Sequence, residues 1–103
     1  MLFIKLELKV LWAKHFLGLA IDYVTNKNQR IPVTNYFFWP KTEAWEQLKI
    51  ELAVKSWIKD DEKIKILNST SEVMNFWLLN RNKNEFNDLK INFPKVKILR
   101  IHP

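Results

Sequence analysis

Apolar side chains occupy every even position among the first twelve residues, and this pattern constrains the fold more than any other part of the chain. Lys5, Glu7 and Lys9 lie at odd positions, whereas every even position is apolar: Leu2, Ile4, Leu6, Leu8, Val10 and Trp12. Successive side chains of a β-strand point to opposite faces, so an alternation of this length predicts a strand with one buried face.

A second strand follows after a short connection. Residues 16–24 alternate as well, and their apolar side is formed by Leu17, Leu19, Ile21 and Tyr23. Because only residues 13–15 lie between the two alternating stretches, they should pair as an antiparallel hairpin. A polar loop then leads into a third extended stretch over residues 31–39. Pro32 near its start predicts an edge strand, since proline lacks the N–H that a ladder needs.

Helical periodicity begins beyond the third strand. Thr42 is a good N-cap, and apolar side chains at helical spacing predict a helix over residues 42–55. Asp60 is positioned to cap a second helix over residues 60–79, with a kink or a restart near Ser69.

The order of these elements predicts an α+β fold. We expect a small antiparallel sheet of three strands covered by a helical hairpin. An α-β C-terminal extension should follow, with a short helix over residues 86–93 and either a strand or an extended arm over residues 96–101. A length of 103 residues favours one domain. We place this single α+β domain at residues 1–79 and a basic C-terminal extension at residues 80–103.

The densest group of aromatic residues lies where the third strand meets the first helix. Residues 34–45 hold five rings in twelve positions. Tyr36 and Phe38 should point to one side of the strand, and Phe37 and Trp39 to the other. One pair enters the core, and the other faces solvent, a helix or a partner. We favour packing, because the helices need a surface to cover, over stacking of nucleobases on exposed rings.

The residues that catalysis and metal binding need are missing or scattered. There is no cysteine, and His15 and His102 lie far apart in sequence, so we expect neither a metal site nor a catalytic residue. A single glycine excludes a glycine-rich phosphate loop. The acids at 60–62 are explained by the dipole at the start of a helix. We therefore expect no enzyme, no cofactor and no small-molecule substrate.

Positive charge is concentrated at both ends of the chain. The net charge is +6, with five Lys/Arg against two acids in residues 1–40, six against seven in 41–80, and six against two in 81–103. Such a charge favours a polyanionic partner. The candidate RNA-binding residues are Lys5, Lys9, Lys14, Lys27, Arg30, Lys95, Lys97 and Arg100. No apolar run approaches the ~20 residues that span a bilayer, so we expect no membrane partner.

Several tryptophan-centred motifs resemble one known family. They are Lys9-Val10-Leu11-Trp12, Tyr36-Phe37-Phe38-Trp39-Pro40, Ala44-Trp45-Glu46-Gln47-Leu48-Lys49, Ser56-Trp57-Ile58 and Glu72-Val73-Met74-Asn75-Phe76-Trp77. In this order and spacing, over most of residues 2–78, the chain resembles the plastid-specific ribosomal protein 3 family, a component of the small subunit of chloroplast-type ribosomes.

The resemblance implies a structural constituent of the plastid (chloroplast) small ribosomal subunit, acting in translation. Its expected partners are small-subunit rRNA, whose phosphates the basic residues would neutralise, and neighbouring ribosomal proteins. The basic extension would dock on the domain or on rRNA, and the Tyr36/Phe38 side could instead be buried against a neighbouring protein. The chain begins with Met directly before the strand pattern, which favours a gene inside the organelle.

Two other functions remain open from the residues alone. A regulator acting off the ribosome would use Tyr36 and Phe38 to bind single-stranded RNA. A protein–protein adaptor is the second alternative, because lysine outnumbers arginine fourteen to three and AT-rich codons alone produce such a bias.

Overall fold

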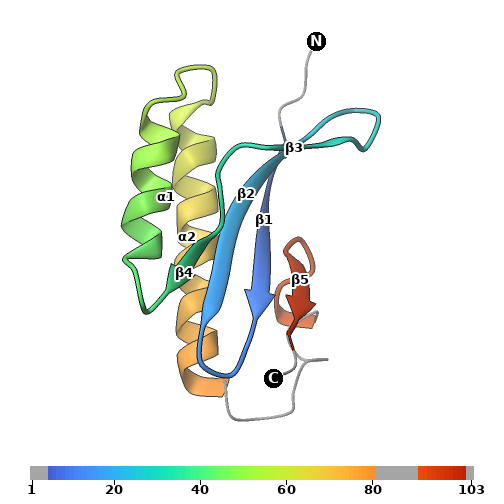
Figure 1. Cartoon of the computed structure of the whole chain (residues 1–103). Coiled ribbons are helices and arrows are strands. Elements are labelled where there is room, and N and C mark those ends of the chain that lie inside the picture. The colour runs from blue at the N-terminus through green and yellow to red at the C-terminus, as the bar shows by residue number, and fades with distance from the viewer. Residues whose placement is uncertain (1–4, 81–90, 102–103) are drawn as a thin grey trace.

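The computed structural model describes residues 5–80 and 91–101, which form a mixed sheet of five strands with two helices on one of its faces (Figure 1). This confirms the predicted α+β class. The elements are β1 (Lys5–Trp12), β2 (Leu17–Val24), β3 (Arg30–Pro32), β4 (Phe37–Trp39), α1 (Ala44–Ala53), α2 (Asp60–Asn80) and β5 (Lys97–Arg100).

The predicted hairpin is present. β1 and β2 pair antiparallel along their whole lengths, with Leu8 opposite Ile21 and Val10 opposite Leu19. These four side chains are at most 1% exposed. The alternation in the sequence therefore gives the hairpin one apolar face, which the two helices cover.

The single third strand predicted over residues 31–39 is wrong. The chain forms two short strands instead, which pair with opposite ends of β2: β3 with Asp22–Val24 and β4 with Leu17–Leu19. Between them, the Thr34 hydroxyl accepts a hydrogen bond from the Ile21 N–H at 3.0 Å, so a side chain takes the place of a strand partner. Pro32 does lie in an edge strand, as expected.

The sheet is not antiparallel throughout. β5 pairs parallel with β1, with Val10 opposite Ile98, and the strand order is β3-β2-β1-β5, with β4 also on β2. A parallel neighbour needs a long crossover, and the segment that holds α1 and α2 lies between the two strands. The short helix expected over residues 86–93 falls mostly outside the described residues.

Both predicted helices exist, and only the first begins at a different residue from the one predicted. α1 begins at Ala44, and Glu43 at its N-cap makes no capping hydrogen bond from its side chain. Thr42, the predicted cap, instead donates its hydroxyl to the Phe38 carbonyl at 2.7 Å. α2 runs without a restart at Ser69, and the buried Thr70 hydroxyl within it donates to the Ile66 carbonyl at 2.7 Å.

Tryptophan side chains join the helices to the sheet. Trp77 of α2 is fully buried, and its Nε1–H donates to the Ala13 carbonyl at the end of β1, at 2.7 Å. Trp39 of β4 meets the Trp77 ring edge-on, with 5.4 Å between the ring centroids. Phe37 and Trp39 thus face the helices. Neither described helix is both long enough and apolar enough to cross a membrane.

Candidate nucleic-acid interface

The sheet face opposite the helices, here called the open face, gathers half of the predicted cationic residues. Strand alternation and register place the side chains of four residues of β1, four of β2 and one or two of each other strand on the open face. They are Lys5, Glu7, Lys9, Leu11, Gly18, Ala20, Asp22, Val24, Arg30, Pro32, Phe38, Lys97 and Leu99. In Figure 1 both helices lie on the other side of the sheet. Lys5, Lys9, Arg30 and Lys97 therefore share one surface.

Two of these cations are ion-paired within the protein. The carboxylate of Asp22 is only 2% exposed, with Oδ1 at 2.8 Å from Lys9 Nζ and Oδ2 at 3.8 Å from Arg30 Nη1. Arg30 Nη2 also lies 2.7 Å from Glu7 Oε1. Asp22 Oδ1 accepts no hydrogen bond in the described part of the chain, so the ion pair with Lys9 compensates its burial. Lys9 and Arg30 thus stabilise the sheet, and part of their charge is neutralised.

The other half of the open face, next to the hairpin turn, is aromatic. Phe16, Tyr36 and Phe38 form a group that we call the aromatic platform. Phe38 meets Phe16 edge-on at 5.7 Å between centroids and is stacked with Tyr36 at 6.3 Å. Lys9 Nζ lies 5.0 Å from the Tyr36 ring centre, a cation–π contact. The packing predicted for both aromatic pairs therefore holds for Phe37 and Trp39, whereas Phe38 is 41% exposed.

The only glycine of the chain lies under the platform. Phe38 is directly opposite Gly18 in the β2–β4 ladder. A Cβ at Gly18 would be 3.0 Å from Phe38 Cε1 and 3.1 Å from Leu11 Cβ, closer than such atoms normally approach. The missing side chain is what allows the Phe38 ring to lie against the sheet.

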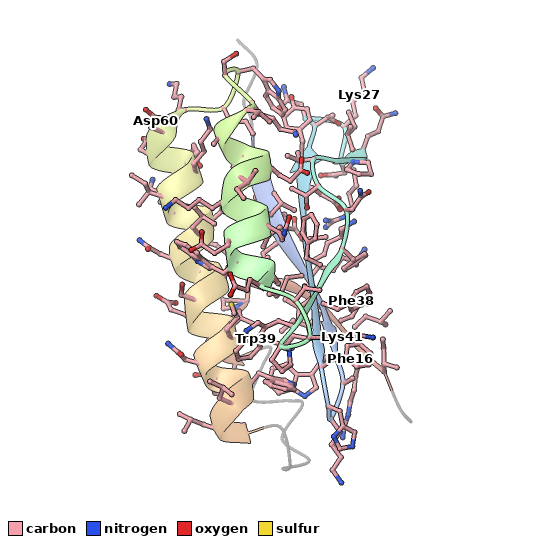
Figure 2. The ribbon with its side chains drawn as sticks, turned by 60° about the vertical axis from the view of Figure 1, so that its left-hand side comes forward. Phe16, Lys27, Phe38, Trp39, Lys41 and Asp60 are labelled. Atoms are coloured by element: carbon pink, nitrogen blue, oxygen red, sulfur yellow. The ribbon has the colours of Figure 1, made fainter. Side chains whose placement is uncertain are left out.

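The remaining predicted cations lie at the ends and at one edge of the sheet. Lys14 is exposed in the β1–β2 turn, and Lys27 is exposed in the turn after β2, at the opposite end (Figures 1 and 2). Lys95 precedes β5, and Arg100 is half-buried opposite Trp12 in the parallel ladder.

One cation near the platform was not among the predicted residues. Lys41 lies in a turn that the Thr42 N–H closes by donating to the Phe38 carbonyl at 2.9 Å (Figure 2). The sequence placed Lys41 beside the start of a helix, and only its distance of three residues from Phe38 could have linked it to the platform.

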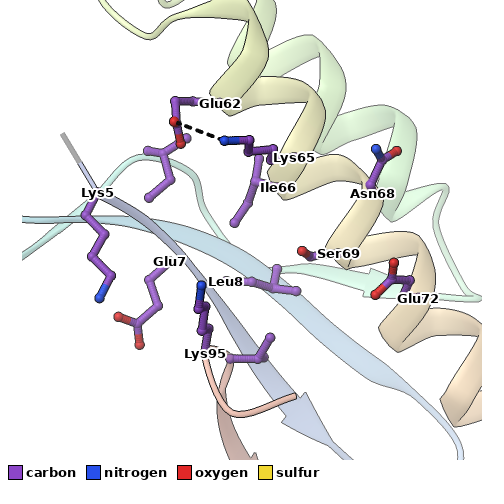
Figure 3. Close-up of a pocket in the computed structure, with 12 residues that line it drawn as sticks. Lys5, Glu7, Leu8, Glu62, Lys65, Ile66, Asn68, Ser69, Glu72 and Lys95 are labelled. Carbon is purple, nitrogen blue, oxygen red and sulfur yellow. Dashed lines mark ion pairs between the residues drawn. The ribbon is translucent and has the colours of Figure 1, made fainter. Parts of the chain in front are cut away.

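A groove of about 480 Å³ lies between the first half of β1 and α2 (Figure 3). Its charged lining is balanced, with three lysines and three glutamates: Lys5, Lys65, Lys95, Glu7, Glu62 and Glu72. Lys65 Nζ and Glu62 Oε1 are 4.0 Å apart. Because the carboxylates would repel phosphate, the groove is a poor site for RNA.

The helical layer differs in charge from the open face. Residues 42–80 contain five lysines and seven acids, and several pair along the helices, as Lys55 does with Glu51 at 3.5 Å. Within residues 5–80 and 91–101, no three His, Asp or Glu side chains gather as metal ligands would. The charge of the described chain therefore favours contact with a polyanion through the sheet and not through the helices.

Comparison with known proteins gives one consistent result. Residues 33–80 match the family model described as plastid and cyanobacterial ribosomal protein (PSRP-3/Ycf65). Small ribosomal subunit protein cS23 of Gracilaria tenuistipitata var. liui is 41% identical over 92% of this chain and 95% of its own length. Probable small ribosomal subunit protein cS23 of Synechococcus sp. (strain JA-3-3Ab) is 42% identical, over 91% and 94%. Small ribosomal subunit protein cS23z of Arabidopsis thaliana is 37% identical, over 71% and 44%.

Proposed function

The chain belongs to the plastid and cyanobacterial ribosomal protein family PSRP-3/Ycf65, and on that basis we propose that it is a structural constituent of the small ribosomal subunit of a plastid. The observation that carries this proposal is the 41% identity, over nearly the full length of both chains, to a small ribosomal subunit protein. The family consists of ribosomal proteins and not of enzymes. The relatives' names do not favour an RNA regulator acting off the ribosome or an adaptor.

The protein would bind rRNA through the open face and the two ends of the sheet. The candidate residues are Lys5, Lys9, Lys14, Lys27, Arg30, Lys95, Lys97 and Arg100. Because Lys9 and Arg30 already pair with Asp22 and Glu7, the exposed lysines would supply most of the phosphate contacts. Such contacts position a protein on RNA without reading its sequence. The more acidic helical layer would then face neighbouring ribosomal proteins.

We also propose that residues 1–79 form the folding unit, a hairpin-based sheet covered by the α1–α2 pair, and that residues 80–103 are an extension docked on it. The parallel pairing of β5 with β1 supports this docking. The extension would bring Lys97 to the same face as Lys9, which lies opposite it in the ladder, and Lys95 to the groove beside α2.

Sedimentation tests the proposal. Plastid extract is separated on a density gradient, and the chain is followed together with small-subunit rRNA. We expect the protein in the small-subunit fractions and its release as salt increases, because phosphate contacts weaken steeply with salt. Gradient fractions in which small subunits lack the chain would contradict the assignment.

The contact face is tested with paired variants in the same assay. Lys14→Gln combined with Lys27→Gln should lower the salt concentration at which the protein is released. Lys49→Gln combined with Lys65→Gln, which removes two exposed positive charges from the helical layer, is the control. Equal release of the two proteins would argue against the open face and the ends of the sheet as the rRNA contact.

A further inference from the structure

The aromatic platform has properties that phosphate binding alone does not explain. Phe38 leaves 41% of its surface exposed although it lies in a sheet strand, and Leu99, on the neighbouring part of the open face, is 62% exposed. The Tyr36 and Phe38 rings are stacked with an interplanar angle of 24°, so two nearly parallel rings lie on a surface that neither helix covers. Exposed rings at fixed positions are what a nucleobase needs in order to stack.

The chain segments that form the platform side of the open face carry only positively charged residues. The segments that build this half of the open face are residues 9–21, 33–42 and 91–101, and none of them contains Asp or Glu. Lys14 follows the end of β1, Lys41 follows β4, and Lys97 lies in β5, so cations flank the rings on three elements. Glu7 and Asp22 belong to the other half of the face, where both pair with Arg30. Asp22 also pairs at 2.8 Å with Lys9, whose Nζ lies 5.0 Å from the Tyr36 ring centre, so the one carboxylate near the platform is neutralised by a lysine.

From this arrangement we propose that the aromatic platform binds unpaired bases of RNA, with Phe38 as the stacking ring and the flanking lysines on the adjoining phosphates. The inference rests on the proposed function and adds a contact to the bases of a single-stranded or looped segment. A duplex would not fit, because its bases are stacked on one another and are not available to a side chain. Docking of another protein is less favoured, since the centres of protein interfaces are depleted in charge and in lysine.

The test compares two RNAs of identical length and phosphate number. One is a short single-stranded oligoadenylate, and the other carries abasic ribose at each position, so that only the bases differ. We expect the full chain to bind the base-bearing RNA at least about five-fold more tightly, the lower end of what one base–aromatic stack contributes. Fluorescence anisotropy of labelled RNA at low salt measures both affinities.

Variants assign the preference to Phe38. Phe38→Leu should reduce the affinity for oligoadenylate to that for the abasic RNA, whereas Phe38→Trp, which keeps a ring, should retain the preference. Trp57→Leu is the matched control, because Trp57 is a similarly exposed ring (49%) that lies against Tyr23 on the other face. Circular dichroism of each variant shows whether it is folded.

The outcomes separate this inference from the proposed function. Equal affinity of the unmodified protein for the two RNAs, or a preference that survives Phe38→Leu, would overturn base stacking. If, in that case, Lys14→Gln weakens the binding of both RNAs equally, the proposed phosphate contacts remain supported without base stacking. If Phe38→Leu changes neither affinity but prevents incorporation into small subunits, the platform is a protein contact and the inference is wrong.

Discussion

Trp77 joins α2 to the end of β1, so its replacement by phenylalanine is a direct test of how the two layers are held together. The Trp77→Phe change keeps an aromatic ring among Trp39 and its neighbours but removes the Nε1–H that donates to the Ala13 carbonyl at 2.7 Å. Ala13 is 7% exposed, so water reaches its carbonyl poorly.

Two terms give the expected loss of stability. A buried acceptor that loses its donor costs about 1–3 kcal/mol. The smaller ring also removes buried apolar atoms from a fully buried site, at about 1 kcal/mol or somewhat more. Together they predict a loss of roughly 2–4 kcal/mol, which corresponds to a fall in Tm of about 8–30 °C for a domain of this size.

Thermal unfolding followed by far-UV circular dichroism measures this shift, with urea unfolding as a second estimate of the free energy. Trp57→Phe is the control, because Trp57 is 49% exposed and a phenylalanine can keep the edge-on contact with Tyr23. Its stability should change by no more than about 0.5 kcal/mol, as is usual for surface positions. Equal midpoints for the two variants would refute the reasoning about the Trp77–Ala13 hydrogen bond.

Three further predictions concern the open face and the end of the sheet. In RNA titrations at several salt concentrations, Lys27→Gln should lower the slope of log affinity against log salt by about 0.7–0.9, the share of one phosphate contact. Lys65→Gln should leave this slope unchanged, and an unchanged slope for Lys27→Gln would exclude the contact. Gly18→Ala introduces a methyl group 3.0 Å from Phe38 Cε1, so the ring must move. We expect about 1 kcal/mol of destabilisation in urea unfolding and a weaker preference for base-bearing RNA. An unaltered preference would contradict this geometry. Asp22→Asn leaves Lys9 and Arg30 without their buried carboxylate. Because these two side chains are 20% and 34% exposed, the change should cost about 1–3 kcal/mol in urea unfolding, and an unchanged midpoint would mean that water solvates both cations instead.

The local elements of this fold follow from periodicity, but its long-range pairings do not. Alternation over residues 2–12 and 16–24 predicts both strands and their hairpin, because only a short turn separates them. The break between β3 and β4 depends on the Thr34 hydroxyl replacing a strand partner of Ile21, which no alternation rule encodes. The parallel pairing of β5 with β1 joins residues about ninety positions apart and is not visible in local pattern.

The candidate site was predictable in part for the same reason. Alternation places Tyr36 and Phe38 on one side of the chain, but it does not say which side the helices cover. From the sequence alone we expect Lys9 and Arg30 to be available for RNA. Strand register brings the carboxylate of Asp22 next to both of them. Which cations are neutralised is therefore a property of the folded sheet.

The position of β5 beside β1 bears on how the protein is made. A nascent chain leaves the exit tunnel with its amino end first, so β1 and β2 can pair long before residues 97–100 emerge. Until then residues 9–12 of β1 present an unsatisfied edge, and such edges recruit strands of other polypeptides. Closure of the sheet at this edge thus waits until residues 97–100 have left the tunnel.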